Sequence, residues 1–208
     1  DLYEQFEFKT WLADLSSEKS VIEAVPPDKR NYIRIDTEAA LKNWADEVRA
    51  AGQFAFDTET TSLDYMEADL VGVSLCTNPG NAGYIPIAHS ALAGGRQLAL
   101  DHVLAVLSPL LEDPAIVKIG QNIKYDMSVL ARYGVKIRGR LIDTMLESYV
   151  LNSVATRHNM DALAEKYLGI KTISFEEVAG KGSKQITFDH VPIEQAVSYA
   201  AEDADVTI

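Results

Sequence analysis

The sequence predicts an α/β fold in which a mixed β-sheet is flanked by helices. Two patterns in the chain support this fold class. Three strand-like runs follow one another after residue 53, separated by turn residues such as Asp64 and Asn78-Pro79-Gly80, which is typical of an antiparallel meander. From about residue 98 onward, helical and strand-like patterns alternate. A meander followed by alternating units predicts a mixed sheet with helices packed on it.

The domain organisation follows from length and local composition. The chain has 208 residues, 47% of them apolar, which is enough for one domain with a full core and a short appended segment. Residues 1–30 contain an aromatic-rich stretch and the pair Pro26-Pro27, so we expect a linker with one short helix there and the domain at 31–208. Because Asp1 rather than Met comes first and Ile208 falls inside an unfinished helical pattern, we expect a part of a longer protein.

The first elements of the domain are expected in this order. Ile33 and Ile35 alternate about Arg34, which indicates a strand, and Asp36 or Thr37 then caps a helix. That helix has a core face of Leu41, Trp44 and Val48 and ends at Gly52. The strands of the meander are expected at residues 54–59, 70–77 and 83–88.

The second half of the domain alternates. We expect a helix at 98–111, a strand at 116–119, a helix at 122–133, a strand near 140–142, helices at 144–151 and 160–168, a polar loop at 180–185 and a last helix from Pro192.

Composition excludes some classes of protein. No run of eighteen apolar residues and no basic segment followed by an apolar one occurs, so we expect neither a membrane span nor a secretory signal, and a cytoplasmic location. The single cysteine, Cys76, excludes an internal disulfide and lies in an apolar run, which predicts a buried structural thiol. The net charge of −12 argues against a nucleic-acid partner at first sight. Carboxylates that bind divalent cations are neutralised in a working site, however, so the charge alone does not decide.

Two carboxylates stand close together at the end of the first meander strand. Asp57 and Glu59 are two residues apart, so their side chains share one face of the strand. The start of this run, Phe54 to Phe56, is too apolar for a surface strand. Two like charges at the end of a buried strand are unfavourable unless a cation lies between them. The alternative is a pair of solvated residues at a strand end.

Two further carboxylates are expected on helices. Asn122 and Asp126 lie one turn apart on one face, although Asn122 is also a common helix cap. Tyr199 and Asp203 also share a face, although a tyrosine in this position is more often part of the core. Glu202 and Asp205 fall on other faces of the last helix and are expected to be solvated.

Four carboxylates from three segments suit hard divalent cations such as Mg²⁺ and Mn²⁺, which prefer oxygen ligands. A site with two such ions, as used for phosphodiester cleavage, needs several carboxylates, one of which bridges the ions. No histidine has a spacing that indicates a metal site, although His158, next to Arg157, is a candidate for assisting a phosphate contact. A glycine loop that cradles phosphate and a zinc motif are both missing from the sequence.

With these residues identified, the chain resembles the proofreading 3′→5′ exonuclease domain of bacterial family A DNA polymerases. Three motifs match the tyrosine-bearing branch of the four-carboxylate exonucleases: Asp57-Thr58-Glu59, Asn122-x-x-Tyr125-Asp126 and Tyr199-x-x-x-Asp203. The similarity extends through residues 56–63, 117–133, 143–154, 160–163, 175–182 and 199–207. Residues 1–15 resemble the end of the segment that joins a 5′-nuclease domain to the exonuclease domain, and a polymerase domain would follow Ile208. The resemblance implies a ribonuclease-H-like fold.

The resemblance also implies a mechanism. Asp57 would bridge two divalent ions, Glu59 and Asp203 would complete the first site, and Asp126 would hold the second ion through water. The ions are expected to be Mg²⁺, with Mn²⁺ or Zn²⁺ as substitutes. Tyr199 would orient the attacking water together with Glu59, and the product would be a 5′-mononucleotide released from a single-stranded or frayed 3′ end of DNA.

The positions that match the DNA contacts of the family are Leu63 and Phe175 for the terminal bases and, near the phosphates, Gln121, Asn122, Tyr125 and Arg157. Without the resemblance, Leu63 and Phe175 would be interpreted as core residues. Lys181 and Lys184 either touch the strand or belong to a solvated loop.

Two alternatives remain at this stage. The chain could be a non-polymerase member of the same superfamily that trims RNA, which would share the carboxylates. It could also be a catalytically weak domain that only braces a polymerase, although such domains lack the carboxylates present here. We expect a monomer that acts beside the polymerase and 5′-nuclease domains of its parent chain.

Overall fold

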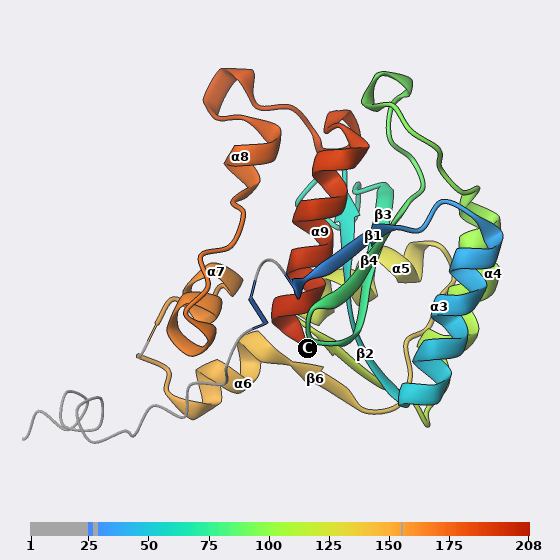
Figure 1. Ribbon diagram of the computed structural model, residues 1–208. Helices are drawn as coiled ribbons and strands as arrows, with labels where there is room; N and C mark the ends of the chain where they lie inside the picture. Colours follow the sequence, from blue (N-terminus) through green and yellow to red (C-terminus); the bar gives the residue numbers. More distant parts are fainter. Residues whose placement is uncertain (1–24, 27–28, 155) are drawn as a thin grey trace, which may run out of the picture.

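The computed structural model describes residues 25–26, 29–154 and 156–208. The expected linker at 1–30 and its short helix lie almost wholly outside these residues. The described part forms one six-stranded mixed sheet with helices on both faces (Figure 1), which confirms the predicted fold class.

The sheet has the strand order β1-β4-β3-β2-β5-β6. Strands β2, β3 and β4 form the expected antiparallel meander, whereas β1 pairs with β4, β5 with β2, and β6 with β5 in parallel. The strands are β1 (Asn31–Arg34), β2 (Gln53–Thr60), β3 (Leu70–Asn78), β4 (Asn81–Pro86), β5 (Val117–Gly120) and β6 (Leu141–Asp143).

The helices agree with the expected order and differ in detail. They are α3 (Glu38–Ala51), α4 (Leu100–Leu111), α5 (Ile123–Arg132), α6 (Thr144–Leu151), α7 (Met160–Leu163), α8 (Phe175–Ala179) and α9 (Ile193–Thr207). The expected helix at 160–168 is divided, because a π-helical turn, η3 (Ala164–Leu168), follows α7. The short helix α8 was not predicted. Three 3₁₀ turns are η2 (Ala91–Ala93), η4 (Gly182–Lys184) and η5 (Phe188–His190).

The ends of α3 show how local sequence sets an element. Thr37, rather than Asp36, is the cap, since its hydroxyl accepts a hydrogen bond from the amide of Ala40. Gly52 ends the helix in the left-handed region, at φ 68°, and its amide donates to the carbonyl of Val48.

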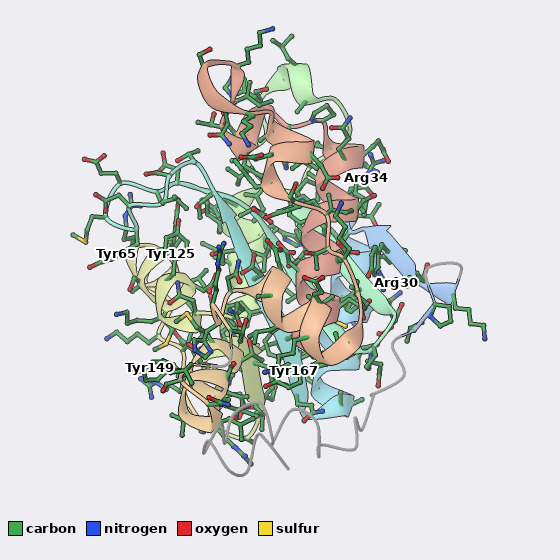
Figure 2. The ribbon with its side chains drawn as sticks, turned by 90° about the vertical axis from the view of Figure 1, so that its left-hand side faces the viewer. Arg30, Arg34, Tyr65, Tyr125, Tyr149 and Tyr167 are labelled. Carbon is green, nitrogen blue, oxygen red and sulfur yellow. The ribbon has the colours of Figure 1, made fainter. Side chains whose placement is uncertain are left out.

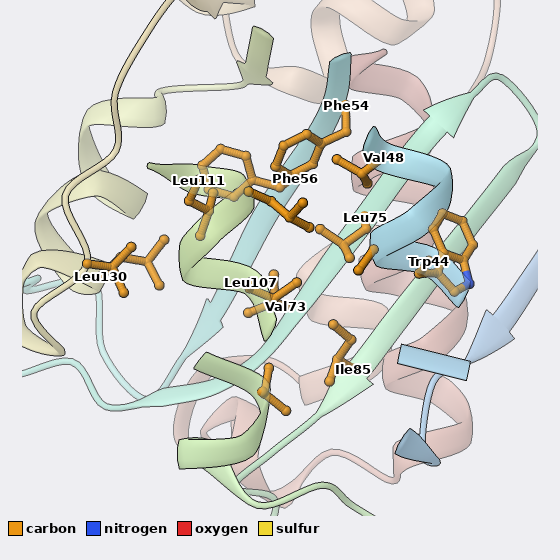
Figure 3. Packing of buried hydrophobic residues seen from close by; sticks show 14 of the residues in the cluster. Trp44, Val48, Phe54, Phe56, Val73, Leu75, Ile85, Leu107, Leu111 and Leu130 are labelled. Atoms are coloured by element: carbon orange, nitrogen blue, oxygen red, sulfur yellow. The ribbon is translucent and has the colours of Figure 1, made fainter. Parts of the chain in front are cut away.

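One face of the sheet is covered by α3, α4 and α5. Trp44 and Val48 of α3 pack there with Phe54 and Phe56 of β2 and with Leu107 and Leu111 of α4 (Figure 3). Burial of large apolar side chains of this kind stabilises the domain by roughly 1.5–3 kcal/mol for each side chain.

The other face of the sheet is covered by α9, which crosses it in red in Figure 1. Four of the ten buried residues of α9 are alanines, among them Ala200, Ala201 and Ala204, and small side chains let a helix approach a sheet closely. Ala55 of β2 faces α9, and side chains two residues apart share a face, so Asp57 and Glu59 also face α9. The packing therefore directs both carboxylates toward the last helix.

Cys76 is buried beside Asp205, and burial raises the pKa of the thiol to about 12, which agrees with a structural role. Within the described residues, the helices are too short or too polar to cross a membrane.

Candidate active site

Three carboxylates converge where β2 meets α9. One oxygen from each of Asp57, Glu59 and Asp203 lies within 4.8 Å of the others. Glu59 and Asp203 are buried, and Asp57 is partly exposed. The expected convergence of segments more than 140 residues apart in the sequence is thus present in the structure.

The electrostatics of this carboxylate cluster are unfavourable without a cation. Burial and the charge of Asp203 raise the pKa of Asp57 to about 8. Burial, followed by the charges of Asp57 and Asp203, raises the pKa of Glu59 well above its ordinary range. Glu59 Oε1 is buried and has no hydrogen-bond partner among the described residues. Oxygen ligands in excess of their hydrogen-bond donors fit a hard divalent cation.

Asp126 approaches the same strand from α5. Its Oδ1 accepts hydrogen bonds from the amide of Thr58, at 2.9 Å, and from the Thr58 hydroxyl, at 2.5 Å. Burial and then the charge of Asp57 raise its pKa, while the two bonds from Thr58 act in the opposite direction. Asp126 therefore lies beside Asp57 but outside the group of three converging carboxylates.

The start of α5 corrects one interpretation of the sequence. Asn122 stands at the cap position with φ 57°, but its side chain makes no capping hydrogen bond in the described structure. Asp143 caps the helix instead, because its carboxylate accepts from the amides of Asn122 and Ile123, both at 3.1 Å. The Asn122 side chain is left to line the groove described below.

Tyr199 lies one turn before Asp203 and is partly buried. Burial, and then the charges of Asp203, Glu59 and Asp57, raise its pKa, so the phenol keeps its proton at neutral pH. Its ring packs against Phe175 and Phe188, with centroids 6.3 and 5.8 Å away. Tyr199 is thus packed among aromatic side chains, as the core interpretation expected, and also lies close to the carboxylates.

A groove of about 870 Å³ opens beside the carboxylates. Five of the six positions expected to contact DNA line it, namely Leu63, Gln121, Asn122, Tyr125 and Phe175, together with Asp57, Glu59, Asp126 and Tyr199. Leu63 is 96% exposed, so its alternative interpretation as a core residue is wrong. Arg157 is exposed and is not among the lining residues, so its contact with phosphate stays a prediction.

The structure also places residues that the sequence did not indicate. Gln185, Ile186, Thr187 and Phe188 line the groove opposite the β2 end. They lie at the end of the expected polar loop and just after it, and the alternation of Ile186 and Phe188 with polar residues is typical of a strand and carried no signal for a site. Lys181 and Lys184 are exposed and do not line the groove, which favours the solvated loop.

Two predictions about other side chains are wrong. Glu202 and Asp205, expected to be solvated, are buried. The reason is that α9 is covered by the sheet on one side and contacts α7 and α8 as well, so it has little solvated face. His158 is buried, and its ring nitrogens lie 2.9 Å from Ser148 Oγ and 3.1 Å from the Ser153 carbonyl, which leaves no nitrogen for a phosphate.

The mixed sheet gathers acidic residues from β2 and α9, and the class of the protein is that of the nucleases, because the chain belongs to the 3′-5′ exonuclease family, whose model matches residues 32–208. It is similar to DNA polymerase I of Pseudomonas aeruginosa, with 50% identity over 215 residues that cover 100% of this chain and 24% of that protein. It is also 42% identical to DNA polymerase I of Rhizobium leguminosarum, over 94% of this chain and 21% of that protein. The chain thus spans about a quarter of the length of these curated relatives.

Solved structures share the ribonuclease-H-like fold. Escherichia coli RNase D, an exoribonuclease involved in structured RNA processing, superposes with a TM-score of 0.62 at 21% identity, covering 85% of this chain and 42% of that one. The polymerase domain structure of Pol1 from M. smegmatis, in complex with DNA primer-template and dNTP, gives a TM-score of 0.61 at 21% identity, covering 84% of this chain and 25% of that one. The predicted family and fold are therefore confirmed, and the chain is a hydrolytic exonuclease domain by family.

Proposed function

We propose that this domain removes nucleotides from the single-stranded or frayed 3′ end of DNA, using two divalent metal ions, and so proofreads for a DNA polymerase. The observation that carries the proposal is the convergence of Asp57, Glu59 and Asp203, with a buried Glu59 oxygen that has no hydrogen-bond partner in the described part of the chain. Mg²⁺ is the proposed metal, with Mn²⁺ or Zn²⁺ as substitutes. The polymerase and 5′-nuclease domains are the proposed partners, in a cytoplasmic monomer.

The carboxylates would hold the metal. Asp57, Glu59 and Asp203 would hold the first ion, and Asp57 and Asp126 would hold the second. When bound, divalent ions lower the pKa of coordinated water and stabilise the charge that develops on the phosphate and the leaving oxygen. Tyr199, which stays protonated, can donate its hydroxyl proton to a nearby oxygen and so orient the attacking water together with Glu59.

The groove supports a substrate with unpaired bases. Leu63 and Phe175 offer exposed apolar surface on which a base can stack without its identity being read. Gln121, Asn122 and Tyr125 present polar groups along the same groove, where a phosphate chain would lie, and Arg157 is the proposed further contact.

The test is release of 5′-mononucleotides from a 5′-end-labelled DNA strand with a frayed 3′ end, in Mg²⁺ or Mn²⁺, with EDTA as control. We expect metal-dependent shortening from the 3′ end. Equal or faster shortening of an RNA strand of the same sequence would favour the RNA-trimming alternative. A strand that stays intact at high protein concentration would instead indicate a bracing domain.

A further inference from the structure

Glu202 connects α9 to two segments that are remote in the sequence. Its Oε1 accepts a hydrogen bond from Arg30, just before β1, at 3.0 Å. Its Oε2 accepts from the amide of Ile173 at 2.6 Å. Glu202 is 5% exposed, and the Arg30 side chain is also buried in this pair. Arg30 is labelled in Figure 2. Both carboxylate oxygens of Glu202 are therefore occupied by donors, whereas Oε1 of Glu59 has no hydrogen-bond partner among the described residues.

The bond to Ile173 fixes the start of α8. Ser174 caps α8 in a reciprocal capping box with Glu177, and Phe175 is the first residue of the helix. The Phe175 ring stacks on Phe188, with centroids 6.3 Å apart, and meets Tyr199 edge-on. Because only Ser174 separates Ile173 from Phe175, the bond from the Ile173 amide to Glu202 restricts where this ring stands at the groove.

Glu202 also precedes Asp203 directly on α9. The start of α8, which carries Phe175, is thus anchored on the residue that directly precedes Asp203. A 3′-terminal base that stacks on Phe175 is thereby held at a set distance from the carboxylates.

We propose that Glu202 is a positioning residue. It holds the Phe175 ring at a fixed position relative to Asp203, so that a terminal base is bound over the metal site. This inference rests on the proposed exonuclease function. A charge-assisted hydrogen bond is among the stronger ones in proteins, so its loss should weaken substrate binding about tenfold. The chemistry itself should change little, since Glu202 does not belong to the group of converging carboxylates.

The experiment compares two double variants of this chain. Arg30→Met with Glu202→Leu removes the ion pair without leaving a buried charge and also removes the acceptor for the Ile173 amide. Arg30→Met with Glu202→Gln removes the same charges but keeps an amide oxygen that can accept from Ile173. We expect KM for a frayed DNA strand to rise about tenfold in the Leu variant with kcat nearly unchanged, and to return toward the wild-type value in the Gln variant.

A double-mutant cycle that combines Phe175→Ala with the Leu variant shows whether Glu202 acts through the Phe175 ring. If it does, Phe175→Ala added to the Leu variant raises KM no further than Phe175→Ala alone. Equal KM in the Leu and Gln variants, or fully additive effects with Phe175→Ala, overturns the inference. If the Leu variant does not fold, Glu202→Asp takes its place, because it keeps the charge near Arg30 and withdraws the carboxylate from Ile173. A wild-type chain that releases no nucleotides contradicts the proposed function itself, so the two failures are distinguishable.

Discussion

Helix α9 carries three buried acidic residues within four positions, and they differ in their surroundings. Asp203 faces Asp57 and Glu59, two further acids. Asp205 accepts hydrogen bonds from the Tyr32 hydroxyl at 2.6 Å and from the Gly80 amide at 2.5 Å. Glu202, as described, has donors on both oxygens.

The comparison teaches that burial of a charge does not by itself identify a site. A buried carboxylate whose oxygens have donors stabilises the fold, and removal of one partner from such a network is costly. A buried carboxylate surrounded by like charges destabilises the fold and is retained for what it binds. Carboxylates with donors and a carboxylate among like charges alternate along α9. Substitutions of neighbouring residues on one helix can therefore separate the two kinds.

The largest effect is expected for Asp203→Asn. Loss of one of the converging carboxylates should lower the rate of nucleotide release by about a thousandfold, because stabilisation of the transition state is lost. In EDTA the same variant should unfold at a higher temperature than wild type, since one buried like charge is removed. A single-turnover assay and a thermal melt check both parts, and a variant that loses both activity and stability would show that Asp203 is structural.

For Asp205→Ala we expect the opposite pattern, a loss of stability without a loss of activity. The substitution leaves the Tyr32 hydroxyl and the Gly80 amide without their acceptor, which should cost about 3 kcal/mol of unfolding free energy. The molecules that remain folded should keep their exonuclease activity. Urea unfolding measures the loss, with Asp205→Asn as the milder control. An unchanged urea midpoint would refute the distinction drawn between the two kinds of acid.

A smaller effect is expected from pH in the metal-free chain. The pKa of Asp57 is raised from 3.8 to about 8 by burial and by Asp203, so the folded state holds this proton more tightly than the unfolded state. That stabilisation is complete below the unfolded pKa and is lost as the pH rises through about 8. The melting temperature in EDTA should therefore fall between pH 5 and pH 8.

Asp57→Asn is the control for this pH effect, because it should flatten the fall. Mg²⁺ added at pH 8 should raise the melting temperature of wild type, since ligands that bind only the folded state stabilise it. A melting temperature in EDTA that rises from pH 5 to pH 8 would count against a cluster of destabilising carboxylates.

The smallest effect is expected for Asp46→Ala on α3. Asp46 pairs with Lys42 at 2.6 Å and with Arg49 at 3.0 Å, and all three side chains are at least half exposed. Solvent screens such pairs, so the free energy of unfolding should hardly change. Urea unfolding should find this variant close to wild type. A loss comparable to that of Asp205→Ala would mean that exposure does not weaken these contacts.

Most of the fold was predictable because its signals are local. The alternation of Ile33 and Ile35 about Arg34, and the spacing of Leu41, Trp44 and Val48, reflect which side each element buries. The division of the helix at 160–168 carried no such signal. Helix α8 did carry one, the capping box of Ser174 and Glu177, but its five residues are too few for a helical periodicity.

The residues of the site also divide into those with a local sequence signal and those without one. Asp57, Glu59, Asp126 and Asp203 stand in motifs, and five of the six expected DNA contacts line the groove. The burial of Glu202 and Asp205 could not be predicted, because their hydrogen-bond partners lie 29 or more residues away in the sequence and outside α9. The cap of α5 was missed for a related reason, since Asp143 reaches it from β6, 21 residues away.

That cap has a consequence for how the chain tolerates change. Asp143 accepts from Asn122 and Ile123 at the start of α5 and also from Met145 and Leu146 at the start of α6, so one carboxylate joins the beginnings of two helices. The direction of α5, and with it the aim of Asp126, is thus set at the helix's first turn rather than at its far end. A substitution of Asp143 should therefore disturb the starts of both helices at once.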